Sequence, residues 1–129
     1  MKKISLFTKA AFHFSNVILL ILYLYPGSIL GLVVYGDFQK QPSITPNFIV
    51  SSNHVYAFLV LTILGVLSVE KNKVKILFIY LFSISIILEL CHGIIPKRSF
   101  QYSDLFGNFF GVLLVFIVFN FNHYFKNQK

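Results

Sequence analysis

The chain is poor in charged residues, and this scarcity is the first constraint on its fold. Of its 129 residues only 12% are charged and four are acidic, whereas 57% are hydrophobic and the mean hydropathy is +0.77. A soluble domain of this size could not bury so much apolar surface. The composition therefore excludes an ordinary soluble domain and predicts an integral membrane protein.

Cysteine is also scarce, because Cys91 is the single one and lies in an apolar run. One thiol excludes an internal disulfide and a cysteine-based metal site. The sequence has no Gly-x-Ser-x-Gly motif, so nothing supports a serine nucleophile. The net charge of +7 does not indicate nucleic acid, because the lysines cluster between and outside the apolar runs, as topology signals do. We predict a lipid bilayer as partner, no nucleic acid and no cofactor.

Four apolar runs are long and continuous enough to predict membrane helices. They cover roughly residues 12–34, 49–69, 74–95 and 105–121. A bilayer core is crossed by about 20 helical residues, and continuous runs favour helices over barrel strands. Sixteen Phe and seven Tyr fit lipid-facing and interfacial positions. The predicted fold is an all-α polytopic membrane protein, a single domain over residues 1–129 with four transmembrane helices.

The first run contains Pro26-Gly27, which predicts a kink or a break in its helix. An alternative is a cleaved signal peptide, because three lysines precede the run. No small-x-small cleavage site follows the apolar segment 17–25, and apolar residues continue beyond Pro26-Gly27. The pattern favours a retained helix and leaves cleavage as the alternative.

The distribution of basic residues predicts how the helices are oriented. With the N-terminus inside, eight lysines fall on the inner side and three basic residues on the outer side. This excess predicts that both termini are cytoplasmic and that the segments 35–47 and 96–103 face outward. The inner residues are Lys2, Lys3, Lys9, Lys71, Lys73, Lys75, Lys126 and Lys129, and the outer ones are Lys40, Lys97 and Arg98.

Six polar residues fall at about the same depth, near the predicted outer ends of the helices. Glu89 and His92 are three residues apart and share one helix face. Asp104, Asn108 and Gly111 follow an i, i+4, i+7 spacing and share a face of the last helix. The six residues are His54, Glu89, His92, Arg98, Asp104 and Asn108.

The hydrocarbon of a membrane restricts where such polar side chains can lie. A carboxylate in hydrocarbon costs several kcal/mol unless it is paired or hydrated, so Glu89 should face the bundle interior or a wet cavity. The spacing Gly107-x-x-x-Gly111 should let a neighbouring helix approach closely. We therefore expect five of these side chains to surround one outward-opening cavity, namely those of His54, Glu89, Arg98, Asp104 and Asn108.

Each of these residues has a structural interpretation beside the functional one. Glu89 could form a buried salt bridge with Arg98 or Lys97, or act as an acid or base in a pocket. Arg98 could hold a phosphate or carboxylate bidentately, or simply extend to the membrane interface.

The remaining members leave similar alternatives. Asp104 could cap the last helix, in competition with Ser103. Asn108 could hydrogen-bond within the cluster, which is also a packing role. His54 and His92 could be ligands, proton carriers or interhelical hydrogen-bond partners, and their spacing matches no recognised zinc motif. We assign no metal on this basis.

Three segments together resemble the signature of the VanZ-like membrane proteins. Glu89-Leu90-Cys91-His92 is similar to the family's E-L-x-Q, and Pro96-Lys97-Arg98-Ser99-Phe100 to its P-x-R-S-F. Asp104-x-x-x-Asn108-x-x-Gly111 resembles its D-x-x-x-N-x-x-G, and His54 the histidine of an earlier D-K-x-x-H segment. The chain departs from that segment, because Val50 and Ser51 replace the Asp-Lys pair.

The resemblance implies a multi-pass protein of the bacterial cell membrane. The family is named after an accessory protein linked to resistance to the glycopeptide teicoplanin, and no agreed activity covers it. The resemblance therefore bears on fold and on location in the cell envelope more than on a reaction, and whether the chain is an enzyme stays open.

The residues themselves favour a site for a lipid-linked, phosphate-bearing or glycan ligand in the outer leaflet. We assign Glu89, His54 and Asp104 as catalytic candidates. We assign Arg98, Asn108 and His92 as ligand-binding candidates, with Arg98 holding an anionic group. The alternatives are a non-enzymatic envelope factor, in which the same cluster only holds the bundle together, and a small transporter subunit. The sequence does not predict an oligomeric state.

Overall fold

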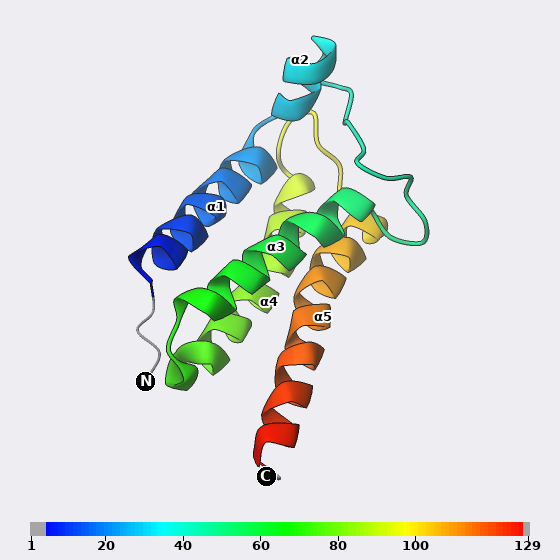
Figure 1. The fold of residues 1–129 in the computed structure, drawn as a ribbon. Helices are drawn as coiled ribbons and strands as arrows, with labels where there is room; N and C mark the ends of the chain where they lie inside the picture. The colour runs from blue at the N-terminus through cyan, green and yellow to red at the C-terminus, as the bar shows by residue number, and fades with distance from the viewer. Residues whose placement is uncertain (1–4, 128–129) are drawn as a thin grey trace.

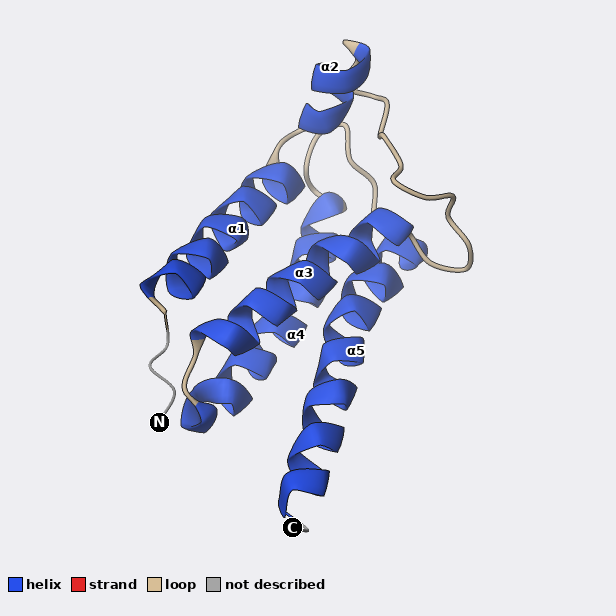
Figure 2. Cartoon of the chain, viewed as in Figure 1, coloured by secondary structure: helices blue, strands red, loops and turns tan. Residues whose placement is uncertain are grey.

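The computed structural model describes residues 5–127, and their side chains as far as residue 124. Within that range the chain is helical, with no strand (Figures 1 and 2). Lys2, Lys3 and Lys129 lie outside the described residues, as does the side chain of Lys126. The elements are α1 (Leu6–Leu24), α2 (Ile29–Tyr35), α3 (Ser52–Ser68), the short 3-10 helix η1 (Lys71–Lys73), α4 (Val74–His92) and α5 (Tyr102–Asn127).

The first apolar run is broken, so the predicted single helix over residues 12–34 is two helices, α1 and α2. Pro26 disfavours helical backbone in the residue before it, and Tyr25 is extended with ψ of 134°. Gly27 then turns the chain with φ of +97°, a conformation that favours glycine. Ser28 starts α2 by accepting a hydrogen bond from the Gly31 N–H at 2.9 Å. The break turns the chain away from the bundle.

Three helical segments are long and apolar enough to cross a membrane. They are Leu6–Leu24, Lys71–His92 and Tyr102–Tyr124, with 19, 22 and 23 residues. The apolar helix α3 is shorter, with 17 residues. The prediction of an all-helical chain with membrane-spanning helices is confirmed at this level, with three candidate spans in the described part of the chain.

The closest helix pair is α3 with α5, and two glycines of α5 explain why. A Cβ on Gly107 would lie 2.7 Å from the backbone oxygen of Ser51, and one on Gly111 would lie 2.6 Å from that of Val55. Only glycine fits at such distances, so the predicted close approach at Gly107-x-x-x-Gly111 is confirmed. The helix α1 packs against α3 and α4 on the other side of the bundle.

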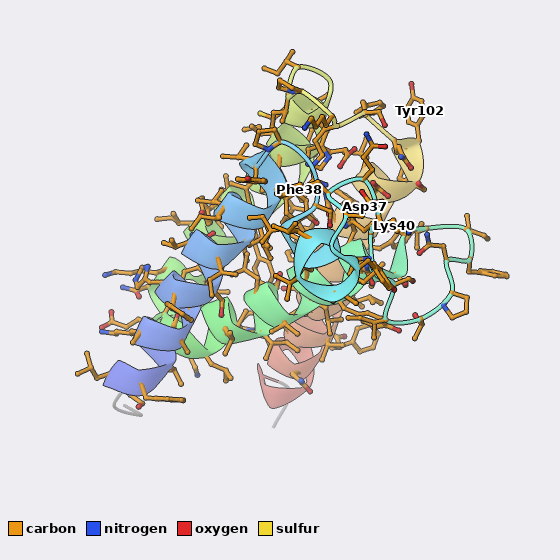
Figure 3. All side chains as sticks on the ribbon, turned by 90° about the horizontal axis from the view of Figure 1, so that it is seen from above. Asp37, Phe38, Lys40 and Tyr102 are labelled. Carbon is orange, nitrogen blue, oxygen red and sulfur yellow. The ribbon has the colours of Figure 1, made fainter. Side chains whose placement is uncertain are left out.

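The helices run up and down, so the two described ends of the chain lie at the same end of the bundle (Figure 1). The turn through η1 lies at that end too. The opposite end carries α2 and the connections 36–51 and 93–101. Seen from above, the segment with Asp37, Phe38 and Lys40 lies beside α2, while Tyr102 points outward (Figure 3). All six predicted site residues lie toward this second end.

Candidate functional site

Five of the six predicted site residues meet in the bundle interior, and they come from three helices. His54 is on α3, Glu89 and His92 are on α4, and Asp104 and Asn108 are on α5. Glu89 and Asn108 are fully buried, and both histidines are nearly so. The prediction that Glu89 faces the interior is confirmed, because its side chain is closed off from the surface of the chain.

Tyr23 on α1 also belongs to this group, although the sequence analysis did not predict it. Its hydroxyl donates to Asn108 Oδ1 at 2.6 Å and lies 3.1 Å from His54 Nδ1. Its ring stacks on that of His92, with centroids 5.5 Å apart. A tyrosine in an apolar run fits an interfacial position equally well, so the sequence carried no signal for this role.

Asn108 determines which ring nitrogen of His54 carries the hydrogen. The Asn108 Nδ2 group donates to the backbone oxygen of Ser85 at 3.2 Å, which leaves Oδ1 facing His54 and Tyr23. An amide oxygen only accepts, so the His54 Nδ1 atom, 3.0 Å away, must carry a hydrogen and donate it. The neutral form of His54 therefore presents Nε2 as an unprotonated nitrogen.

The Nε2 atom of His54 faces carboxylates. It lies 3.6 Å from Asp104 Oδ2. One ligand-type atom each from His54, Glu89 and Asp104 lies within 4.8 Å of the other two. Oxygen lone pairs and an unprotonated ring nitrogen repel one another at such distances unless a proton or a cation lies between them.

Glu89 pairs with His92, which was not the predicted partner. Glu89 Oε2 lies 3.1 Å from His92 Nδ1, while Oε1 accepts a hydrogen bond from the Gln101 N–H at 3.0 Å. The alternative of a salt bridge to Arg98 or Lys97 is not found, since no ion pair joins them to Glu89 in the part of the chain that the structure describes. The Oε2 contact lacks the alignment of a hydrogen bond, so this buried oxygen has no hydrogen-bond donor among the described groups.

Two basic side chains close the carboxyl end of α1. His92 Nε2 lies 3.0 Å from the backbone oxygen of Tyr23. Arg98 donates to the backbone oxygens of Leu22 at 2.7 Å and Tyr25 at 3.3 Å. The last carbonyls of a helix lack partners within it, and cations there also oppose the negative end of the helix dipole. Arg98 therefore lies over the carboxyl end of α1.

The Arg98 guanidinium has N–H groups that are not used in its two hydrogen bonds to α1. Its remaining contact is a long one, 3.5 Å from Nη1 to the Gln41 side-chain oxygen. Burial lowers the pKa of the guanidinium, and the negative charges of Glu89 and Asp104 oppose that shift. No carboxylate among the described residues lies within ion-pair distance of Arg98. An anion could approach this half-buried cation without displacing an internal partner.

Asp104 is not the cap of α5. The helix begins at Tyr102, so Asp104 lies within the first turn, where a carboxylate still favours the positive helix end. The competing cap, Ser103, is inside the helix too, and its hydroxyl lies 3.4 Å from Asp104 Oδ1. This position turns Asp104 toward His54.

A cavity of about 530 Å³ lies beside the cluster, between α1, α3 and the connection after α2. His54, His92 and Arg98 line its polar end together with Asn53 and Gln41. Glu89, Asp104 and Asn108 do not line it, so the predicted single cavity shared by these three residues with His54 and Arg98 is wrong. The apolar lining comes from α1 (Phe14, Ile18, Leu19, Leu22), α2 (Ile29, Leu30) and α3 (Ala57, Val60, Leu61).

Comparisons of this chain with protein-family models, with curated proteins and with solved structures find no match. The functional argument therefore depends on the cluster and the cavity. Their arrangement separates two regions: a buried carboxylate–histidine cluster between α3, α4 and α5, and an amphipathic cavity that reaches it through His54 and His92.

Proposed function

We propose that this chain is a VanZ-like protein of the bacterial cell membrane, with four transmembrane helices and both termini in the cytoplasm. The 17 residues of α3 rise about 25 Å, which is at the short end of the range for membrane-spanning helices. The excess of lysines on one side and the common end of the described termini support the orientation. In this orientation the cavity and the polar cluster lie toward the outer leaflet.

We infer that the cavity binds an anionic lipid or a lipid-linked anionic glycan from the outer leaflet. The observation that carries this proposal is the division of the cavity into a polar end and an apolar wall. A volume near 530 Å³ suits a headgroup with part of an acyl chain. The side chains of Phe14, Ile18 and Val60 would contact the chain, as apolar walls do in ligand pockets.

Arg98 would contact the charged part of the ligand. It lines the polar end, carries a full charge and has no carboxylate partner among the described residues. Its guanidinium binds phosphate or carboxylate with two parallel hydrogen bonds, which a lysine does not. His54 and Asn53 would complete the polar contacts at the same end.

An accessory, non-enzymatic role is the second candidate, and a specific observation favours it. Tyr23, His92 and Arg98 use their polar groups to join α1 to the rest of the bundle. Glu89 as an acid or base is the enzymatic version of the proposal, with His54 or His92 adjusting its proton affinity. The VanZ resemblance adds the expectation of a role in the cell envelope and in susceptibility to teicoplanin.

The ligand proposal is tested by reconstituting the purified chain in nanodiscs and measuring retained lipid by native mass spectrometry. We expect retention of phosphatidylglycerol over phosphatidylcholine, and at least a tenfold loss in Arg98→Gln, since a charged contact is removed. Lys97→Gln is the matched control, because Lys97 is an exposed cation on the same connection. Ala57→Phe should fill the cavity and reduce binding, whereas Ile63→Phe, outside the lining, should not.

The same variants distinguish the ligand-binding function from the accessory, non-enzymatic function. Lost retention with unchanged thermal stability supports a ligand site. Equal losses of stability and retention in Arg98→Gln, with normal binding by Ala57→Phe, would leave Arg98 as a cap of α1 and the cavity without a ligand. Measuring the teicoplanin susceptibility of cells that express each variant then tests whether lipid binding has a role in the cell envelope.

A further inference from the structure

Three ligand-type side chains from three helices converge in the buried cluster. His54, Glu89 and Asp104 place one nitrogen and two oxygens within 4.8 Å of one another. The distance from His54 Nε2 to Asp104 Oδ2 is 3.6 Å. Two ligands on a tetrahedral ion with bonds of about 2.1 Å lie about 3.4 Å apart, which is close to this spacing. The donor types are those of a metal site, and the wider separations, within 4.8 Å, would shorten around a bound ion.

His54 is prepared for metal binding by its neighbour. Its Nδ1–H donates to Asn108 Oδ1, and the other end of that amide is held by the backbone oxygen of Ser85. A histidine that ligates a metal characteristically donates its second nitrogen to an oxygen acceptor, which fixes the tautomer and the ring. The atom left toward Asp104 is the unprotonated Nε2, the form that ligates.

The second oxygen of Glu89 lacks an aligned hydrogen-bond donor. Its side chain is fully buried, and Oε2 has no hydrogen-bond donor among the described residues. Gln101 holds the other oxygen, and His92 Nδ1 lies 3.1 Å from Oε2 without hydrogen-bond alignment. A buried carboxylate oxygen without a donor is costly, and a cation, either a metal ion or a protonated His92, would remove that cost.

We propose that His54, Glu89 and Asp104 bind a divalent transition-metal cation such as Zn²⁺ or Mn²⁺. One imidazole with two carboxylates suits these ions better than Mg²⁺ or Ca²⁺, which prefer oxygen alone. Three protein ligands from helices also leave coordination positions open, as catalytic metal sites do. The sequence analysis placed these three residues at one depth but assigned no metal, because they come from separate helices with no recognised motif spacing. The inference does not depend on the ligand proposed for the cavity.

The test is the metal content of the untagged, full-length chain, purified without chelator from cells grown with zinc and manganese. Inductively coupled plasma mass spectrometry should find about one ion per chain. When Co²⁺ is added after chelator treatment, a visible absorption band should appear, as expected for a low-symmetry site with nitrogen and oxygen ligands. Asp104→Asn should weaken Co²⁺ binding at least tenfold, and His54→Gln and Glu89→Gln should do the same.

Asp104→Asn is the decisive variant, because the substitution is nearly isosteric and the residue is only partly buried, so the fold should persist. Asp37→Asn, at a partly exposed carboxylate outside the cluster, is the matched control and should bind as the unaltered chain does. Two results would overturn the proposal. One is a folded chain with neither metal nor a Co²⁺ band, which would mean that a protonated His54 pairs with Asp104. The other is unchanged Co²⁺ affinity in Asp104→Asn, which would place the ion elsewhere.

Discussion

The hydroxyl of Tyr23 donates to Asn108 Oδ1 at 2.6 Å, and this hydrogen bond joins the first membrane-length helix to the last. The same Asn108 oxygen accepts from His54 on α3. One buried amide thus links α1, α3 and α5, and through Ser85 it reaches α4 as well. The bundle therefore has a polar centre that binds its four long helices.

Tyr23→Phe should test how much this centre stabilises the bundle. The substitution keeps the ring that stacks on His92 and removes the hydroxyl from a buried amide oxygen. We expect the unfolding free energy in detergent to fall by about 1–3 kcal/mol. Tyr25→Phe is the control, because the Tyr25 hydroxyl has no hydrogen bond in the described part of the chain. Equal stability of the two variants would contradict the role of Tyr23.

Gly111→Ala should separate α3 from α5. The added Cβ would lie 2.6 Å from the backbone oxygen of Val55 and 2.8 Å from the Cβ of Phe58, and neither atom can rotate away. Overpacking of this kind costs about 1–3 kcal/mol, so the thermal midpoint in detergent should fall clearly. Ile117→Ala, on an exposed part of the same helix, should change the midpoint much less. A Gly111→Ala chain as stable as the original would mean that the two helices are not in such close contact.

The partner of Glu89 can be measured by double-mutant cycles. Glu89→Gln leaves His92 without its carboxylate, and removing one member of a buried pair costs about 3–5 kcal/mol. We expect a coupling energy above about 0.5 kcal/mol between Glu89→Gln and His92→Gln. The cycle of Glu89→Gln with Arg98→Gln should be closer to additive, since no ion pair joins those residues in the structure. A stronger coupling of Glu89 to Arg98 than to His92 would support the Glu89–Arg98 salt bridge, one of the two alternatives from the sequence.

The sequence predicts the helices better than the contacts between their polar groups. The start of α4 at Val74 and the shared face of Asp104 and Asn108 follow from apolar runs and helical spacing. The position of Arg98 does not, because it depends on the path of the preceding turn. Lys97 has φ of +61°, a conformation that is uncommon for lysine, and this turn carries Arg98 over the end of α1.

Tyr23 was missed for a different reason. A hydropathy pattern treats a tyrosine the same whether its hydroxyl reaches water at an interface or a buried amide. The break at Pro26 decides between the two, because it ends α1 just where Tyr23 stacks on His92. The sequence placed His54, Glu89 and Asp104 at one depth, but the distances between their side chains are set only when the three helices pack.

The proposed topology can be tested with single cysteines, because Cys91 is the only native one. In a Cys91→Ala background, Ser43→Cys lies in the connection after α2 and Asn72→Cys in η1, both at exposed positions. We expect a membrane-impermeant maleimide to label Ser43→Cys in intact cells and Asn72→Cys only after lysis, because the lysines near η1 hold it in the cytoplasm. Labelling of both in lysed cells is the control for reactivity. The opposite pattern would invert the bundle, and labelling of both in intact cells would mean that α3 does not cross the membrane.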